Sequence, residues 1–313
     1  MAKICFMLFC FLMTSTDLLR GTDEYERDAK IDQFVTHYGS RGQELEALMI
    51  IISLAEQFPG DAYFNILEAK TIWQELEDRL GHNVNYDDNI GDSFVNENIV
   101  LISKFHQAIE MGMKNTEEIK TPRDKYLRAT MHIVGAGFKM RFESPNLLSL
   151  DIGDGIKARQ YADREVALGL QLLEEAVNED NSLCSSYYIF AVTKYKLIQK
   201  TNFFTKALID NVFSSLTYKQ IGSNFNPDDV ENWFEKAMSC SSGYYYTKEI
   251  EWEKKLAFKQ YLLENHHPEK RGHYQRDLKL LSMLEELCRK FPDNKRIQNE
   301  YFLISRHKKT STK

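Results

Sequence analysis

Apolar residues recur every three or four positions along much of this chain, which is the spacing of one face of an α-helix. The first such stripe consists of Leu45, Leu48, Ile51 or Ile52, Ala55 and Phe58. Pro59 ends it, because proline donates no amide hydrogen and disfavours a helical residue before it. Asp61 then stands where a helix cap is needed, and the sequence predicts a second helix over residues 62–80.

The same order of features returns near the C-terminus. The second stripe consists of Leu278, Leu281, Leu284, Leu287 or Cys288, and Phe291. Pro292 breaks this helix, and either Asp293 or Asn294 is placed to cap the next one, over residues 296–306. The pattern therefore predicts a helix pair at each end of the chain.

Further helices are predicted between these two pairs. They span residues 93–113, 123–142 after the Thr121-Pro122 start signal, 158–197, 228–240 after Asn226-Pro227, and 243–265. Hairpin signals are nearly absent, with one Asp-Gly at 154–155. The sequence thus predicts an all-α protein of four to five helix pairs. A single amphipathic pair cannot bury its own apolar face, whereas several stacked pairs share a continuous core.

Three segments resemble the tetratricopeptide repeat, at the end of its second helix and the turn that follows. They are LLEEAVNEDN (172–181), WFEKAMSC (233–240) and MLEELCRKFPDN (283–294). The resemblance implies a right-handed stack of antiparallel helix pairs, a tetratricopeptide-like α-solenoid. The turns fall about 50–70 residues apart rather than at the 34-residue period of that repeat, so the predicted stack is irregular.

The chain is also similar, over roughly residues 25–307, to exported bacterial helical-repeat proteins and to the related T component of TRAP-type transport systems. The shared features are an early FP-D turn, a long central helix ending in GLQLLEEAVNEDN, a Tyr-rich helix and a final FPDN turn. The resemblance implies a non-enzymatic binding or scaffold protein that holds a protein partner. The alternative is a periplasmic accessory of a solute transport system that binds a small organic ligand.

The N-terminus predicts export. Lys3 precedes ten residues without charge (4–13), and small polar residues follow at 14–16, which is the arrangement of a secretory signal peptide. Cleavage is expected between about residues 16 and 21, leaving 22–313 as one helical domain in the periplasm or cell envelope. The run is too short to span a bilayer, and a buried N-terminal helix is the alternative. Phe9 disfavours a lipoprotein anchor at Cys10, where a small residue usually precedes the cysteine.

Composition limits the possible partners and the redox chemistry. The 313 residues are 43% hydrophobic and 27% charged, with a net charge of −6, so a basic surface for nucleic acid is not expected. Of the cysteines beyond the signal, Cys184, Cys240 and Cys288, none has CxxC spacing. Buried free thiols are the preferred interpretation, and no disulfide is assigned.

Motifs for catalysis or metal binding are missing. The sequence lacks G-x-S-x-G, a P-loop and H-E-x-x-H, which argues against an enzyme, a metal and a cofactor. His266, His267 and His273 lie in a proline-containing segment predicted to be a solvated loop. Residues 151–155 are predicted to be a turn before a helix rather than a calcium loop.

Aromatic residues supply the candidate binding site. Tyr187, Tyr188 and Tyr195 fall on one predicted helix, and Tyr244, Tyr245 and Trp252 on a later one. The simpler interpretation is core packing between neighbouring pairs. The functional hypothesis is that some of these rings line a groove that binds a ligand or partner, since aromatic side chains combine rigid contact area with a polar tip.

Overall fold

The computed structural model describes residues 22–80, 90–143, 152–200, 227–239, 258, 259, 262 and 274–310. The described chain is all-helical, as the sequence predicts, and none of these residues forms a strand. Its α-helices are α1 (Thr22–Val35), α2 (Glu44–Gln57), α3 (Ala62–Leu80), α4 (Asp92–Glu97), α5 (Ile99–Asn115), α6 (Pro122–Phe138), α7 (Ile152–Glu179), α8 (Cys184–Lys200), α11 (Pro227–Ser239), α13 (Tyr274–Lys290) and α14 (Lys295–Thr310). Two π-helical segments, η3 (Thr36–Arg41) and η4 (Lys139–Glu143), follow α1 and α6.

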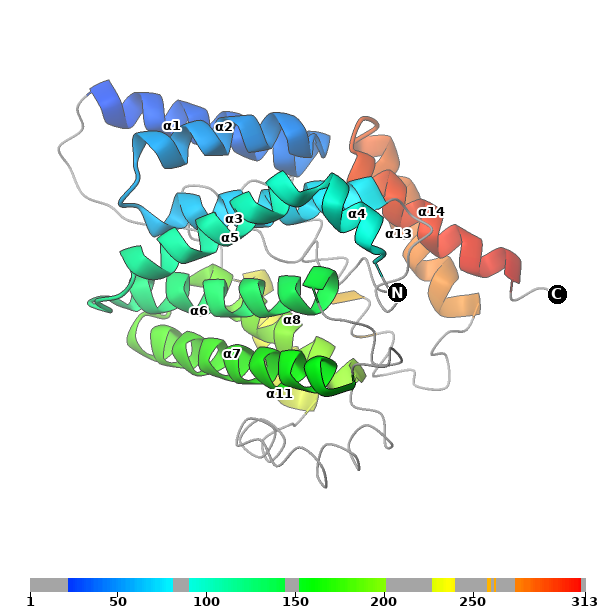
Figure 1. Ribbon diagram of the computed structural model, residues 1–313. Coiled ribbons are helices and arrows are strands. Elements are labelled where there is room, and N and C mark those ends of the chain that lie inside the picture. The colour runs from blue at the N-terminus through cyan, green and yellow to red at the C-terminus, as the bar shows by residue number, and fades with distance from the viewer. Residues whose placement is uncertain are drawn as a thin grey trace.

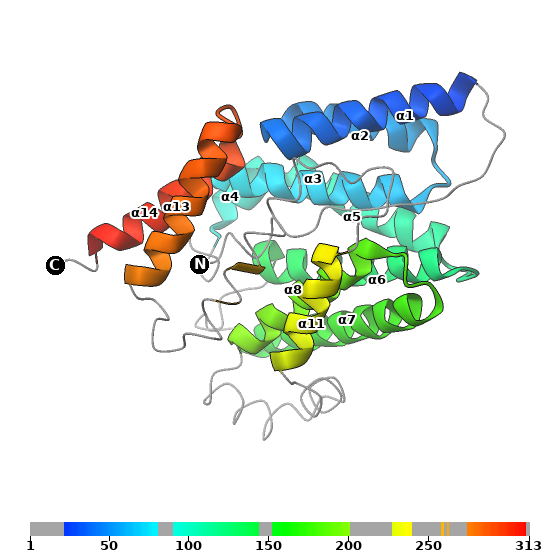
Figure 2. The same cartoon turned by 180° about the vertical axis from the view of Figure 1, so that it is seen from behind.

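Successive helices run back and forth across the molecule (Figure 1). α1 and α2 form one layer, α3 and α5 the next, and α6 and α7 a third, while α8 and α11 lie behind α6 and α7 (Figure 2). Within the described ranges, no helix is both long and apolar enough to cross a membrane.

The predicted caps of the helix pairs are confirmed. Asp61 Oδ1 accepts a hydrogen bond from the Tyr63 amide (3.0 Å), and Thr121 forms a capping box with Asp124 at the start of α6. In the last pair the cap is Asn294, whose Oδ1 accepts from the Ile297 amide at 3.2 Å. Each turn is thus closed by a polar side chain that satisfies amides of the next helix.

In both predicted apolar stripes, the first residue lies outside the core. Leu45 is 51% exposed and Leu278 is 37% exposed, so neither belongs to the core. Ala47 and Leu54 are buried in α2 instead. In α2, apolar residues occur on most sides of the helix, so a three-and-four spacing can be drawn through more than one of its faces.

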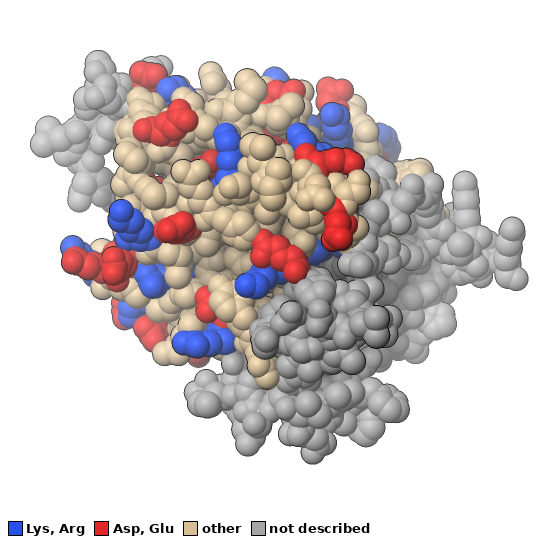
Figure 3. Space-filling model, viewed as in Figure 1, with Lys and Arg blue, Asp and Glu red and all other residues tan. Residues whose placement is uncertain are grey.

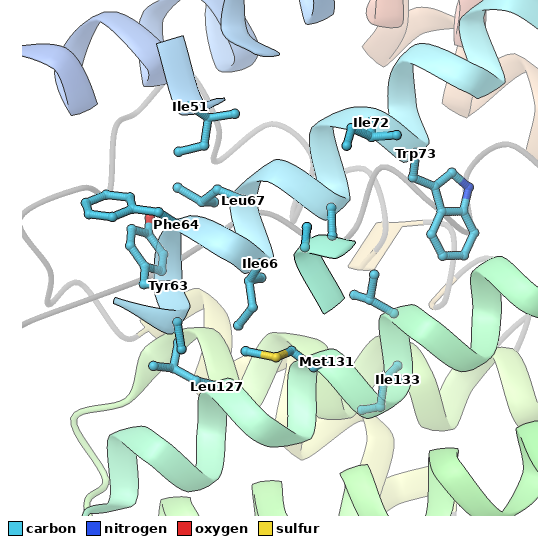
Figure 4. Close-up of a cluster of buried hydrophobic side chains, with 14 of the residues drawn as sticks. Ile51, Tyr63, Phe64, Ile66, Leu67, Ile72, Trp73, Leu127, Met131 and Ile133 are labelled. Carbon is cyan, nitrogen blue, oxygen red and sulfur yellow. The ribbon is translucent and has the colours of Figure 1, made fainter. Parts of the chain in front are cut away.

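The main core lies around α3, which neighbouring helices cover on most sides. In Figure 4, Ile66 and Trp73 project from α3, Ile51 lies above it on α2, and Leu127 and Met131 approach from α6. All five side chains are almost completely buried.

Burial of α3 extends to its charged residues. Arg141 of η4 donates from Nε to Glu77 Oε1 at 2.9 Å and from Nη2 to Oε2 at 3.3 Å, and both side chains are nearly inaccessible to solvent. Trp73 Nε1 donates to the same carboxylate at 3.3 Å. A buried carboxylate persists because these donors replace the water that it has lost.

The packing of α6 on α7 depends on Gly169. A Cβ atom at this position would lie 2.9 Å from the Ala129 carbonyl oxygen and 2.6 Å from Ile133 Cγ1, closer than side chains approach. His132 Nδ1 and Glu165 Oε2 are 2.6 Å apart across the same pair of helices. The backbone of α7 at Gly169 therefore packs directly against the Ile133 side chain of α6.

The last helix pair contacts the first through a buried polar junction. Arg296 of α14 is 3.0 Å from Glu44 of α2, donates to the Tyr38 carbonyl oxygen and lies 4.2 Å from the centre of the Tyr38 ring. Gly42 has a φ of 59°, and a Cβ there would lie 2.7 Å from Asn294 Oδ1. The two pairs predicted at opposite ends of the sequence are neighbours in space (Figure 1).

Candidate binding site

The three described tyrosines of the predicted aromatic site are buried. Tyr187 is 8% exposed, and Tyr188 and Tyr195 are each 1% exposed. They pack in a second hydrophobic cluster between α8 and α11, where Tyr187 lies 5.4 Å from Trp233 and Tyr195 lies 6.4 Å from Phe234 (ring centres). Core packing, the simpler interpretation, therefore describes their position.

The Tyr187 hydroxyl reaches the edge of this cluster, where it donates to the Asn181 carbonyl oxygen at 3.1 Å. Burial, and then the charge of Asp180, raise the pKa of Tyr187. Tyr244, Tyr245 and Trp252 lie outside the described residues. That these six residues bind a ligand stays a prediction.

The expectation that the cysteines are free thiols is wrong for one of them. Cys184, the first residue of α8, is disulfide-bonded rather than a free thiol. Cys288 of α13 is free as predicted but only half-buried, and burial raises the pKa of its thiol. Spacing alone did not indicate the disulfide, because residues far apart in sequence can meet when helices pack.

A hollow of about 550 Å³ opens where the turns of two helix pairs meet. The turn between α2 and α3 forms one wall, and the end of α5 and the start of α6 form the other. Phe58, Pro59 and Leu127 supply apolar surface, while Asp61, Arg123 and Asn115 supply polar groups.

Asp61 and Arg123 form a partly exposed ion pair in the wall of this hollow. Arg123 Nη2 lies 3.3 Å from Asp61 Oδ1 and 3.5 Å from Oδ2. Their side chains are 28% and 33% exposed, so both remain partly open to solvent. Asp124, also in the lining, is occupied differently, because its Oδ2 accepts from the amides of Lys120 and Thr121.

Hydrogen bonds between neighbouring elements hold the walls in place. Asn115 Nδ2 donates to the Pro59 carbonyl oxygen at 2.7 Å and to Asn65 Oδ1 at 3.1 Å, which ties the end of α5 to the α2–α3 turn. Arg128 Nη1 donates to the carbonyl oxygens of Met113 and Thr116 at 3.1 and 2.9 Å and so closes the end of α5. The hollow is therefore formed by structured elements.

A second candidate surface lies over α2 and α5, which flank α3. Leu45 and Met49 of α2 are 51% and 67% exposed, and Val100 of α5 is 67% exposed. We name these three side chains the α2–α5 face. On the side of the molecule in Figure 3, uncharged surface occupies the centre of this region, and most charged side chains lie around it.

The starts of α2 and α5 lie at the same end of α3. Glu44 at the start of α2 interacts with Asp78, and Arg79 Nη1 donates to Asn98 Oδ1 at 2.9 Å, just before α5. Further along, Glu68 of α3 interacts with Glu56 of α2 and Lys104 of α5. Burial raises the pKa of Glu68 to about 7, Lys104 lowers it and Glu56 raises it. The exposed apolar side chains are thus accompanied by one lysine and two glutamates, of which Glu68 is ionised only above about pH 7.

Within the part of the chain that the structure describes, no group of three or more His, Cys, Asp or Glu side chains could hold a metal ion. Comparison with protein-family models, with curated proteins and with solved structures finds no match to this chain. The resemblance to tetratricopeptide-repeat proteins therefore stays a prediction.

Sequence reasoning identified Asp61 and Thr121 as caps but missed the hollow between their turns. Asp61 and Arg123 are 62 positions apart, and only the packing of one helix pair on the next brings them together. The signal available in the sequence was that these two turns belong to helix pairs predicted to follow one another along the chain.

Proposed function

We propose that this chain is a non-enzymatic binding protein whose helix pairs, stacked as in a right-handed, irregular tetratricopeptide-like solenoid, hold a protein partner. The observation that carries the proposal is the exposure of Leu45, Met49 and Val100 on two helices that flank the core helix α3. Aliphatic side chains more than half exposed on helices that both pack on α3 gain free energy when a partner covers them.

The charges beside the face indicate the kind of partner segment. At a pH above about 7, where Glu68 is ionised, Glu56 and Glu68 place two carboxylates against one Lys104, so the border then favours a basic group. We therefore expect a partner helix with an apolar stripe and a Lys or Arg at its edge, bound in the helix-in-groove manner.

Site-specific photo-crosslinking in the native envelope tests this function. Met49 and Val100 are each replaced by a photo-crosslinking amino acid, and Leu168 of α7, a 38% exposed aliphatic residue away from this face, is the matched control. We expect one protein to be captured from positions 49 and 100 and not from 168. Capture of the same proteins from all three positions, or of none, would refute the α2–α5 face as the partner site.

A small-ligand function is the second candidate, and the hollow between the two turns favours it. A volume of about 550 Å³ suits a small organic molecule. In this role the chain would serve as a periplasmic accessory of a solute transport system. Because the hollow and the α2–α5 face use different residues, titration of small molecules and crosslinking separate the two functions.

Export is part of the proposal, with residues 1 to about 16–21 removed as a signal peptide. The disulfide at Cys184 supports it, because disulfides persist in oxidising compartments such as the bacterial periplasm.

A further inference from the structure

We propose that the hollow between the α2–α3 turn and the start of α6 binds an uncharged ligand rich in hydroxyl groups, a mono- or disaccharide, through Gln57 Nε2 and Asn115 Oδ1. The proposal rests on the second candidate function, a small ligand in the hollow, and names the chemical class of that ligand. It is carried by two side-chain amides of the lining, each of which has one end held by the protein and the other end available.

Gln57 provides hydrogen-bond donors. This residue is the last of α2 and is exposed, and its Oε1 accepts a hydrogen bond from Lys30 Nζ at 3.0 Å. Because an ammonium group only donates, this contact fixes which end of the amide faces Lys30. The Nε2 atom has no partner within the described part of the chain, so its two N–H groups are available in the lining of the hollow.

Asn115 provides an acceptor. Its Nδ2 donates to the Pro59 carbonyl oxygen at 2.7 Å and to Asn65 Oδ1 at 3.1 Å. Since a backbone carbonyl only accepts, the amide of Asn115 is held in this orientation. Its Oδ1 forms no hydrogen bond to any residue that the structure describes, although Asn115 belongs to the lining. The two amides together therefore offer a donor and an acceptor that the fold does not use.

The charged groups of the lining are already compensated, which favours an uncharged ligand. Arg123 is paired with Asp61 and is engaged elsewhere as well, so it is not counted as a donor to the ligand. Asp61 and Asp124 also cap the N-terminal ends of α3 and α6, where the helix dipole offsets a negative charge. A charged ligand would thus lose its hydration in the hollow without gaining a free counter-charge.

Hydroxyl groups match the available atoms. A hydroxyl both donates and accepts, so neighbouring hydroxyls of one sugar ring can donate to Asn115 Oδ1 and accept from Gln57 Nε2. Asp61 adds acceptor capacity, because its carboxylate is 28% exposed and accepts in only three contacts, two of them with Arg123. A secondary amide brings one donor only, and it satisfies a lining rich in acceptors less well than several hydroxyls do.

The apolar part of the lining suits the carbon skeleton of a sugar. Phe58, Pro59 and Leu127 lie in the lining, and Phe58 is half-buried, so part of its ring is open. The C–H groups of a sugar ring carry a small positive charge, which the face of an aromatic ring attracts. The volume of about 550 Å³ lies within the range of small-molecule sites.

Calorimetric titration of the full chain with glucose and maltose tests the proposal, and three related compounds test its chemistry. Glucosamine carries an ammonium, glucuronate carries a carboxylate, and cyclohexanol keeps a six-membered ring with a single hydroxyl. We expect each of these three to bind at least about threefold more weakly than glucose, because it brings an uncompensated charge or lacks hydrogen bonds.

A matched pair of substitutions locates the site. Gln57→Met removes the amide from an exposed helix end, keeps a side chain of similar length, and should weaken glucose binding about threefold to tenfold. Gln160→Met is the control, at an exposed position of α7 beside Tyr161, whose ring lies 4.5 Å from Lys139 Nζ at the far end of α6. It should bind glucose as the unaltered chain does, and the unfolding midpoint of each variant verifies that it is folded.

Asn115 is followed by spectroscopy instead, because its substitution would also break the hydrogen bond to Pro59. In nuclear magnetic resonance spectra of the unaltered chain, the side-chain amide signals of Gln57 and Asn115 should shift as glucose is added. The signal of Gln160 should stay in place.

Three results would overturn the proposal. Absence of glucose and maltose binding up to about 10 mM, weaker than ordinary ligand affinities, would exclude the class, and absence of binding by all five compounds would count against the small-ligand function as well. Binding of glucosamine, glucuronate or cyclohexanol at least as tight as that of glucose would leave a small-ligand site but not a sugar site. Equal affinity of Gln57→Met and the unaltered chain for glucose would place the sugar outside the hollow.

Discussion

Glu68 shows how the position of a single residue sets a pH dependence. Its carboxyl lies on α3, partly buried between α2 and α5, and burial raises its pKa from 4.5 to about 7. The folded chain therefore holds this proton more tightly than the unfolded chain does. By linkage, the free energy of unfolding falls as the pH rises from about 4.5 to about 7 and changes no further, through this group, above that range.

Replacing Glu68 with Gln should remove this loss of stability. At about pH 8 we expect E68Q to be more stable than the unaltered chain by about 1–2 kcal/mol, after allowance for solvent screening of a partly exposed site. At about pH 4 the two should be equal, because Glu68 is then neutral. Urea unfolding across this range measures the difference. Parallel profiles for the two proteins would contradict the assignment, and E46Q, at an exposed carboxylate of α2, is the control.

At the scale of the helix, the sequence predicted starts and ends well where a cap or a proline marks them, because local chemistry determines those positions. The prediction of a turn over residues 151–155 was wrong, since α7 already begins at Ile152. Pro59, Asp61 and Thr121 act within one turn of their own position, so no tertiary contact is needed to read them. Burial was harder to predict. α3 buries Lys70 and Glu77 as well as its apolar residues, and periodicity cannot indicate a helix that neighbours cover on most sides.

The packing of α11 on α8 predicts which cysteine is the disulfide partner of Cys184. Cys288 is free, so the partner is Cys5, Cys10 or Cys240. The last turn of α11 lies over the start of α8, with Lys236 Nζ 5.9 Å from the centre of the Tyr187 ring. Because Cys240 directly follows α11 in the sequence, we predict that it is the partner.

Non-reducing peptide mapping of the protein from its native host checks this pairing. A linked pair of peptides containing Cys184 and Cys240 is expected, together with no peptide from residues 1–16 if the signal is removed. C240S should release a titratable thiol at Cys184 and lower the free energy of unfolding by about 2–4 kcal/mol. Recovery of Cys184 as a free thiol from the unaltered protein would contradict the prediction.

At the scale of the whole molecule, the contact between the first and last helix pairs is the feature that sequence could not indicate. Arg296 and Tyr38 are 258 positions apart, and a stack read from its turns alone separates its ends. One feature of the sequence relates to this contact, namely that Glu44 and Arg296 both stand at helix starts. Such residues are ordinarily solvated, however, and burial is what gives them structural importance.

Arg296 and Glu44 should therefore be strongly coupled. Burial raises the pKa of Glu44 well above its usual range and Arg296 opposes this, so removal of the arginine leaves a buried carboxylate without its cation. R296M is expected to lower the free energy of unfolding by about 3–5 kcal/mol at a pH where Glu44 is ionised. The loss should shrink at lower pH, where Glu44 takes up a proton. In E44L/R296M, which replaces both charges with apolar groups, most of the stability should return.

Hydrogen exchange measures whether the first and last helix pairs lose amide protection together. In R296M, amides of residues 38–48 and 294–300 should lose protection together, although these segments are far apart in sequence, while the α6–α7 layer around Gly169 keeps its protection. Loss of protection in 294–300 alone would mean that the last pair is not held by the first. A double variant as unstable as R296M would mean that the junction acts through packing rather than charge, because only a charge effect is relieved when both partners are removed.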